Sequence, residues 1–96
     1  METTTKTKFK ETKQRLKTII DEANKKIYQL NKNLDLESLQ LKDQCIYDLH
    51  VQNWRLGYLE ALNVYESGKG LEHFINLINS KLDEEQKAFE ERRAII

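Results

Sequence analysis

The sequence predicts an all-α protein built from three long antiparallel helices, either a helical bundle or an elongated hairpin with a coiled-coil-like seam. The chain of 96 residues contains no proline and only three glycines, whereas most all-β folds need a turn every ~8–12 residues. Apolar residues also recur at helical spacing in three successive stretches. We expect a frayed tail at 1–5 and a single helical domain over 6–96, with helices at about 6–33, 36–66 and 71–93.

The first stretch carries a narrow apolar stripe. From Leu16 onward its apolar residues are spaced alternately by four and three positions, as in the heptads of a coiled coil. Isoleucine recurs at one seam position and leucine at the other, a combination that favours two-stranded association. We therefore predict a homodimer, with an oligomer seam formed by Leu16, Ile20, Ile27 and Leu30.

A break is expected after this stretch. Asn33 tolerates the left-handed conformation that ends many helices, and Asp35 can cap a second helix by accepting backbone N–H bonds. So short a connection would fold the second helix back against the first. One continuous helix through residue 34 is the alternative, because the segment holds no strong helix breaker.

The second helix is apolar on two opposite sides when its residues are placed at about 100° per residue. One side carries Leu41, Cys45, Leu49, Leu56 and Leu59. The other side carries Tyr47, Trp54, Tyr58 and Tyr65, with Gly57 and Ala61 among them. Rings at helical spacing usually belong to a core, but Trp and Tyr are also favoured anchors at protein–protein interfaces. Both interpretations stay open, and we take the four rings as candidate partner-binding residues.

The third helix follows a turn at 67–70, the clearest turn in the chain. Its expected buried stripe consists of Leu71, Phe74, Ile75, Ile78, Leu82 and Phe89. The turn holds glycine and lysine and precedes a helix, a geometry that can receive an anion. It lacks the residue spacing of a phosphate-binding loop, and no strand precedes it. We therefore interpret the segment as a turn.

Charge does not point to a polyanionic partner. Sixteen basic and sixteen acidic residues cancel, so the chain has no global field that would attract nucleic acid. One helical face is nevertheless basic, with Lys6, Lys10, Lys13 and Lys17. Such a stripe can follow phosphates. A solvated face, or one paired with acidic neighbours, is the simpler interpretation, and nucleic-acid contact is the alternative.

The residues offer no catalytic constellation. Cys45 lies on the leucine-rich side of the second helix, where a free thiol behaves as a small hydrophobe. His50 is about 140° away from it around the helix, so the two do not converge. The single cysteine and the two histidines are not spaced along the chain as the ligands of a metal site would be. We expect no enzyme activity, no metal, no cofactor and no small-molecule substrate.

We predict instead a non-enzymatic module for protein–protein interaction, an adaptor or an inhibitor that occludes a partner's surface. No apolar run reaches the ~18–20 residues of a membrane span, so we expect no membrane association and a cytoplasmic location. The stretch at 54–62 looks like segments of small helical proteins of mobile elements, although it carries no family motif and implies no residue roles. The alternative is a nucleic-acid-binding accessory protein that uses the lysine stripe. A subunit whose catalytic residues lie on another chain is a third hypothesis.

Overall fold

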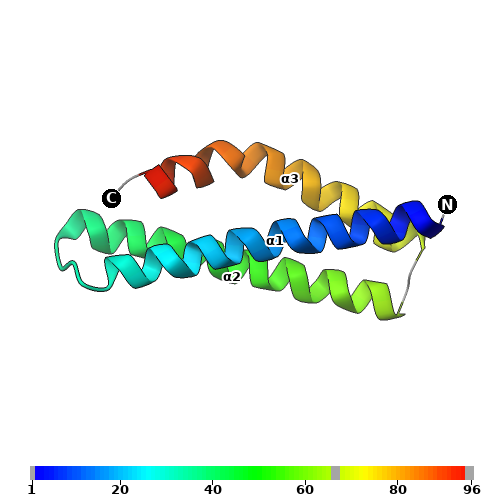
Figure 1. Ribbon diagram of the computed structural model, residues 1–96, viewed down its shortest axis with the longest axis horizontal. Helices are drawn as coiled ribbons and strands as arrows, with labels where there is room; N and C mark the ends of the chain where they lie inside the picture. The colour runs from blue at the N-terminus through cyan, green and yellow to red at the C-terminus, as the bar shows by residue number, and fades with distance from the viewer. Residues whose placement is uncertain (1, 66–67, 95–96) are drawn as a thin grey trace.

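Three long helices make up nearly all of the computed structural model, which describes residues 2–65 and 68–94 (Figure 1). Helix α1 spans Glu2–Leu30, α2 spans Leu36–Tyr65 and α3 spans Lys69–Ala94. No strand occurs among these described residues, so the predicted all-α class is confirmed. The molecule is elongated, 50 × 22 × 15 Å, because a helix of 30 residues is about 45 Å long.

Helix α1 begins earlier than the sequence predicted. Residues 2–5, which were expected to fray, lie in its first turn, and Met1 lies outside the described residues. Once a helix exists, each added residue gains a hydrogen bond without a new nucleation cost. The helix held by Phe9, which packs against the core, therefore extends outward.

The predicted break between the first two helices is present, although α1 already ends at Leu30. The backbone N–H of Asn33 donates to the carbonyl of Leu30 at 3.0 Å. Asp35 caps α2, since its carboxylate accepts hydrogen bonds from the backbone N–H of Ser38 at 3.0 Å and from the Ser38 hydroxyl at 2.8 Å. These bonds hold the pKa of Asp35 below its ordinary value.

Helix α3 begins at Lys69, two residues before its predicted start at Leu71. The backbone N–H of Glu72 donates to the carbonyl of Gly68 at 2.9 Å, so helical bonding already starts at Gly68. The second half of the predicted turn is therefore the first turn of α3. Ser67, which the sequence placed in that turn, lies outside the described residues.

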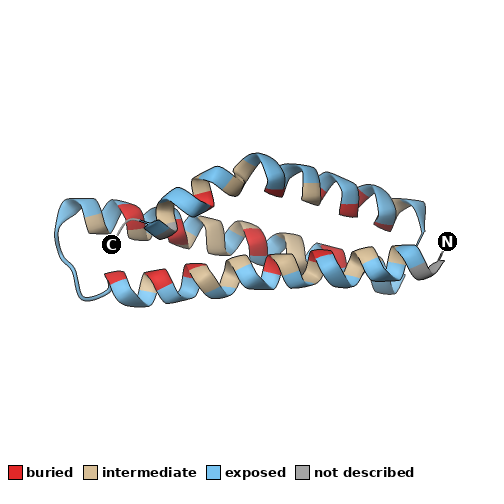
Figure 2. Ribbon diagram, turned by 45° about the horizontal axis from the view of Figure 1, so that its top comes forward, coloured by how far each residue is buried: buried red, intermediate tan, exposed pale blue. Residues whose placement is uncertain are grey.

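The hydrophobic core lies where the leucine-rich side of α2 meets α1 and α3, and the buried positions of the helices turn toward one another (Figure 2). The larger cluster consists of Leu16, Leu59, Leu71, Phe74, Ile75, Ile78, Leu82 and Phe89. A smaller cluster beside the first turn consists of Leu30, Leu41 and Cys45, with Ile27 packed against it. Only one of the two apolar sides of α2 is therefore used by the core.

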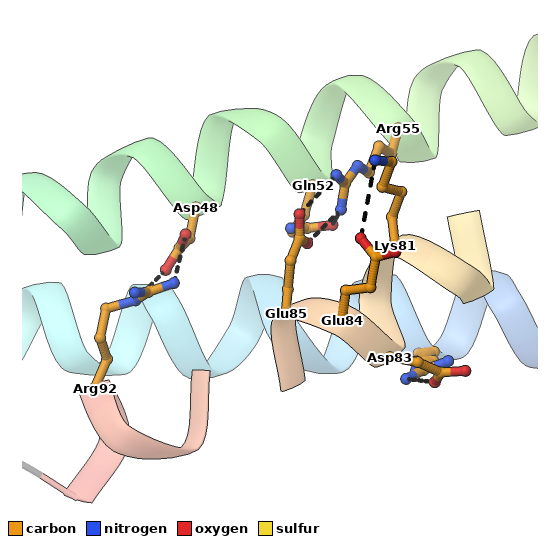
Figure 3. Close-up of polar contacts among 9 residues, drawn as sticks. Asp48, Gln52, Arg55, Lys81, Asp83, Glu84, Glu85 and Arg92 are labelled. Carbon is orange, nitrogen blue, oxygen red and sulfur yellow. Dashed lines mark hydrogen bonds and ion pairs between the residues drawn. The ribbon is translucent and has the colours of Figure 1, made fainter. Parts of the chain in front are cut away.

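Two arginine–carboxylate pairs connect α2 to α3 (Figure 3). Arg55 donates to both carboxylate oxygens of Glu85 at 2.8 and 3.1 Å, and to the side-chain oxygen of Gln52 at 3.1 Å. Arg92 donates to both oxygens of Asp48 at 2.7 and 3.0 Å. The planar guanidinium matches the two oxygens of a carboxylate. These pairs fix the position of the charged second half of α3 beside α2.

A further polar cluster connects α1 to α3. Arg15 donates to the side-chain oxygen of Asn79 at 3.0 Å and to Asp83 at 2.6 Å. Asn79 in turn donates to the hydroxyl of Thr12 at 2.8 Å. Thr12 is buried, and a buried hydroxyl requires such a partner. The cluster therefore sets the register between these two helices.

Candidate interaction surface

Four aromatic side chains of α2 lie on the side of the helix that the core does not use. Tyr47 is 70% exposed, Trp54 64%, Tyr58 46% and Tyr65 87%. At about 100° per residue the four lie within about 40° of one another around the helix. We call these four residues the aromatic face. The interpretation of this face as part of the core is therefore wrong within a single chain for Tyr47, Trp54 and Tyr65, because the leucine-rich side of α2 takes that place.

The middle of the aromatic face is held in place by ring stacking. Trp54 stacks on Tyr58, with ring centroids 5.4 Å apart and an angle of 11° between the planes. Tyr58 in turn contacts Phe74 of α3, with centroids 4.8 Å apart and planes tilted by 59°. Phe74 is buried in the core. The exposed rings thus rest on the packed interior and present a preorganised surface.

Three rings of the aromatic face, Tyr47, Trp54 and Tyr58, lie in a stretch of α2 whose exposed residues carry no charge. Between residues 44 and 58 these are Gln44, Tyr47, His50, Asn53, Trp54, Gly57 and Tyr58. A third of the whole chain is charged, so a neutral exposed stretch of this length is unusual for it. Depletion of charge together with enrichment of aromatic rings is typical of the centres of protein–protein interfaces.

A groove of about 490 Å³ adjoins this face between α2 and the second half of α3. Tyr47 and Val51 line it together with Phe89 and the arginine–carboxylate pairs described above. Among the described residues, no buried side-chain polar atom lacks a hydrogen-bond partner. The two arginines of the groove are paired with Glu85 and Asp48 within the chain, and the apolar wall beside Tyr47 extends the aromatic face.

Cys45 lies on the opposite side of α2, where it is buried with a free thiol, as the sequence predicted. Burial raises the pKa of this thiol, and the nearby charge of Asp48 raises it further. Burial likewise raises the pKa of Asp48, although its hydrogen bonds from Arg92 oppose the shift. A small cavity of about 20 Å³ beside these residues has room for about one water molecule. The arrangement is that of a packed thiol, because a nucleophilic cysteine requires a lowered pKa.

The residues predicted to form an oligomer seam lie in or beside the interior of the single chain. Leu16 belongs to the larger buried cluster and Leu30 to the smaller one. Ile27 packs against the smaller cluster, and Ile20 is half-buried. A monomer therefore covers much of this stripe with its own α2 and α3, whereas the aromatic face of α2 stays exposed.

The lysine stripe lies along α1 and is engaged at one point. Lys6, Lys10 and Lys17 are exposed. Lys13 forms an ion pair with Glu60 of α2 at 3.2 Å, and its ammonium group lies 5.9 Å from the centroid of the Phe9 ring. The expectation that acidic neighbours pair with this stripe therefore holds at Lys13.

His50 and His73 are both exposed. No group of three or more metal-ligating side chains comes together among the described residues. Within the same part of the chain, none of the helices combines the length and the apolar character needed to cross a bilayer. Neither histidine therefore belongs to a site that the structure assembles.

Sequence reasoning did not identify the arginine contacts that fix α3. The available signal was compositional: the chain has only four arginines among its sixteen basic residues, and three of them make these contacts. Arginine is favoured over lysine where an ion pair is partly buried.

Comparisons with protein-family models, with curated proteins and with solved structures give no match to this chain.

Proposed function

We propose that this chain is a non-enzymatic module, an antiparallel three-helix bundle, that binds another polypeptide through the aromatic face of α2. The proposal is supported above all by the exposure of four rings on one side of one helix, three of which lie in a stretch, residues 44–58, without exposed charge. Trp and Tyr are the residues most enriched among the strong contributors to protein–protein binding. Because Trp54 and Tyr58 are already stacked, little side-chain entropy is lost when a partner covers them.

The exposed area supports the same conclusion. The four exposed fractions together correspond to between two and three fully exposed rings, or about 500 Å² at roughly 200 Å² per ring. The largest apolar patch on a typical monomer is about 300–600 Å² and is often functional. Covering such a patch would make the chain an adaptor or an occluding inhibitor.

We also propose a cytoplasmic location, because the one cysteine is a free thiol, as a reducing compartment favours.

Site-specific photo-crosslinking in cells tests this function. Tyr47 on the aromatic face is 70% exposed, and Tyr28 on α1 is 71% exposed, so the two tyrosines form a matched pair. Each is replaced, in separate variants, by the photoreactive analogue p-benzoylphenylalanine. We expect irradiation to produce a discrete polypeptide adduct from position 47 and none from position 28.

The adduct at position 47 can hold a second copy of the chain or a different polypeptide, and either result supports the proposed function. Equal labelling at the two positions, or no adduct at position 47, would overturn it. The analogue keeps an aromatic ring at each site. If no adduct forms, the cause is therefore not the loss of an aromatic side chain.

A further inference from the structure

We infer that the polypeptide that covers the aromatic face is a second copy of this chain, with the two α2 helices packed face to face and antiparallel about a two-fold axis near Trp54. This inference rests on the proposed function and names its partner. In a two-fold interface the same surface patch is used by both copies, so the patch must be complementary to itself.

The electrostatic character of the face meets this requirement. A charged patch would repel its own copy, whereas the exposed residues of α2 from Gln44 to Tyr58 are uncharged. The chain as a whole carries no net charge, so two copies also approach each other without long-range repulsion. A foreign partner recognised by charge would find no complementary group along this stretch.

The area is sufficient for a specific dimer. Two copies of the aromatic face would bury about 1,000 Å² from their rings alone, at roughly 200 Å² per fully exposed ring. A biological interface should exceed about 1,000 Å² in total. Val51, which lines the groove together with Tyr47, adds to this area.

The orientation follows from the residues at the two ends of the face. Asp43 lies four residues before Tyr47, on the same side of α2 and exposed. A parallel pair would place the two Asp43 carboxylates opposite each other. An antiparallel pair centred on Trp54 instead places Asp43 beside Tyr65 of the other copy, whose hydroxyl can donate to it, and places the large Tyr47 beside the small Ala61. Antiparallel helix dipoles also attract each other.

The glycine at position 57 is a second, independent observation in favour of a facing α2 helix from another copy. It lies in the interior of α2, where glycine weakens a helix relative to alanine. A Cβ atom at this position would meet no atom within 4 Å, so packing inside the chain does not require a glycine. Gly57 lies about one turn after Trp54, at the edge of the aromatic face, and a glycine there allows the facing helix of an antiparallel pair to pass close to its backbone.

Light scattering on a sizing column tests the inference with the purified full chain over about a hundredfold range of concentration. We expect the mass to approach twice the chain mass of 11.4 kDa. The variant Tyr47→Ala/Trp54→Ala should raise the dissociation constant about tenfold or more, since interface anchors of this type typically have at least that effect. Tyr28→Ala, which removes an equally exposed ring from α1, should leave the dissociation constant unchanged.

Three outcomes would overturn the inference: a monomer at every concentration, a dimer that survives Tyr47→Ala/Trp54→Ala, or a dimer weakened equally by Tyr28→Ala. If the double variant loses helicity by circular dichroism, Tyr65→Ala decides in its place, because that ring is 87% exposed and contributes little to folding of the monomer.

Photo-crosslinking of the purified dimer tests the orientation and separates the two proposals. The analogue at position 47 should label the other copy between residues 57 and 65, and labelling around residue 47 would contradict the antiparallel arrangement. A purified chain that stays monomeric, while position 47 captures a different polypeptide in cells, would overturn the second-copy inference and leave the proposed function standing. A monomeric chain with no adduct in cells would overturn both.

Discussion

Replacing Gly57 by alanine should strengthen the fold and weaken the dimer. The position is exposed in the interior of α2, and the added methyl group would meet no atom of its own chain within 4 Å. The substitution therefore introduces no clash within one copy. In the dimer the same methyl group would stand at the edge of the contact between the two α2 helices, where it would hold their backbones apart.

The gain in folding is set by helix propensity. Alanine is favoured over glycine in a helix interior by about 0.8–1.0 kcal/mol, and nothing around Gly57 offsets that gain. We expect the free energy of unfolding to rise by about 1 kcal/mol. For a domain of 60–100 residues this corresponds to an increase in Tm of about 4–8 °C.

Folding and association are measured separately to detect the two effects. Thermal unfolding followed by circular dichroism is recorded in the Tyr47→Ala/Trp54→Ala background, where association does not contribute to Tm. The dissociation constant is measured by light scattering in the otherwise unchanged chain. Asn24→Ala, at an exposed position of α1, is the control, because it also raises helix propensity but lies on another helix. It should raise Tm slightly without changing association.

Two results would contradict these expectations for Gly57→Ala. A lower Tm of Gly57→Ala in the monomeric background would mean that part of the same chain occupies the space beside Gly57. A dissociation constant that stays the same or falls would mean that no facing backbone approaches this position.

Further predictions concern the fold that supports the surface. Leu59→Ala should lower the free energy of unfolding in urea by about 2.7–5 kcal/mol, because Leu59 is fully buried and its removal leaves a cavity; a loss below about 1 kcal/mol would contradict the described core. Cys45 should react with iodoacetamide far more slowly in the native protein than in urea, since burial both shields it and raises its pKa; equal rates would show that it is not packed. Asp35→Asn should remove an acid-sensitive part of the stability. The folded-state pKa of Asp35 lies below its ordinary 3.8, so its contribution is present above about pH 3.8 and is lost as the pH falls through the lower folded-state value. The difference in Tm between wild type and Asp35→Asn should therefore shrink on acidification, and a constant difference would contradict this role.

The features set by local sequence were predictable. Helical periodicity gave the all-α class, and the break at Asp35 followed from the capping ability of its side chain, which needs only the next three residues. The helix ends were less predictable, because helices extend at low cost once formed. Glu2 and Lys69 are accordingly helical beyond the predicted starts.

The features set by packing between helices were not predictable. The sequence showed that α2 has two apolar sides, but which side faces the core depends on how α1 and α3 divide the space around it. The pairing of Arg92 with Asp48 joins residues 44 positions apart, and that of Arg15 with Asp83 joins residues 68 positions apart. Such pairs depend on the register between helices, which no local pattern encodes. Because the register between helices is not encoded locally, the sequence also could not decide whether the aromatic face is exposed or belongs to the core.

Quenching of Trp54 fluorescence by acrylamide tests most directly whether a second copy covers the aromatic face. Trp54 is the only tryptophan of the chain, and it is 64% exposed in the single chain, so its fluorescence reports on this surface alone. We expect strong quenching in dilute solution that weakens as the concentration rises, with the same midpoint as the change in mass. Quenching that stays equally strong at every concentration, including those at which the mass doubles, would contradict this expectation.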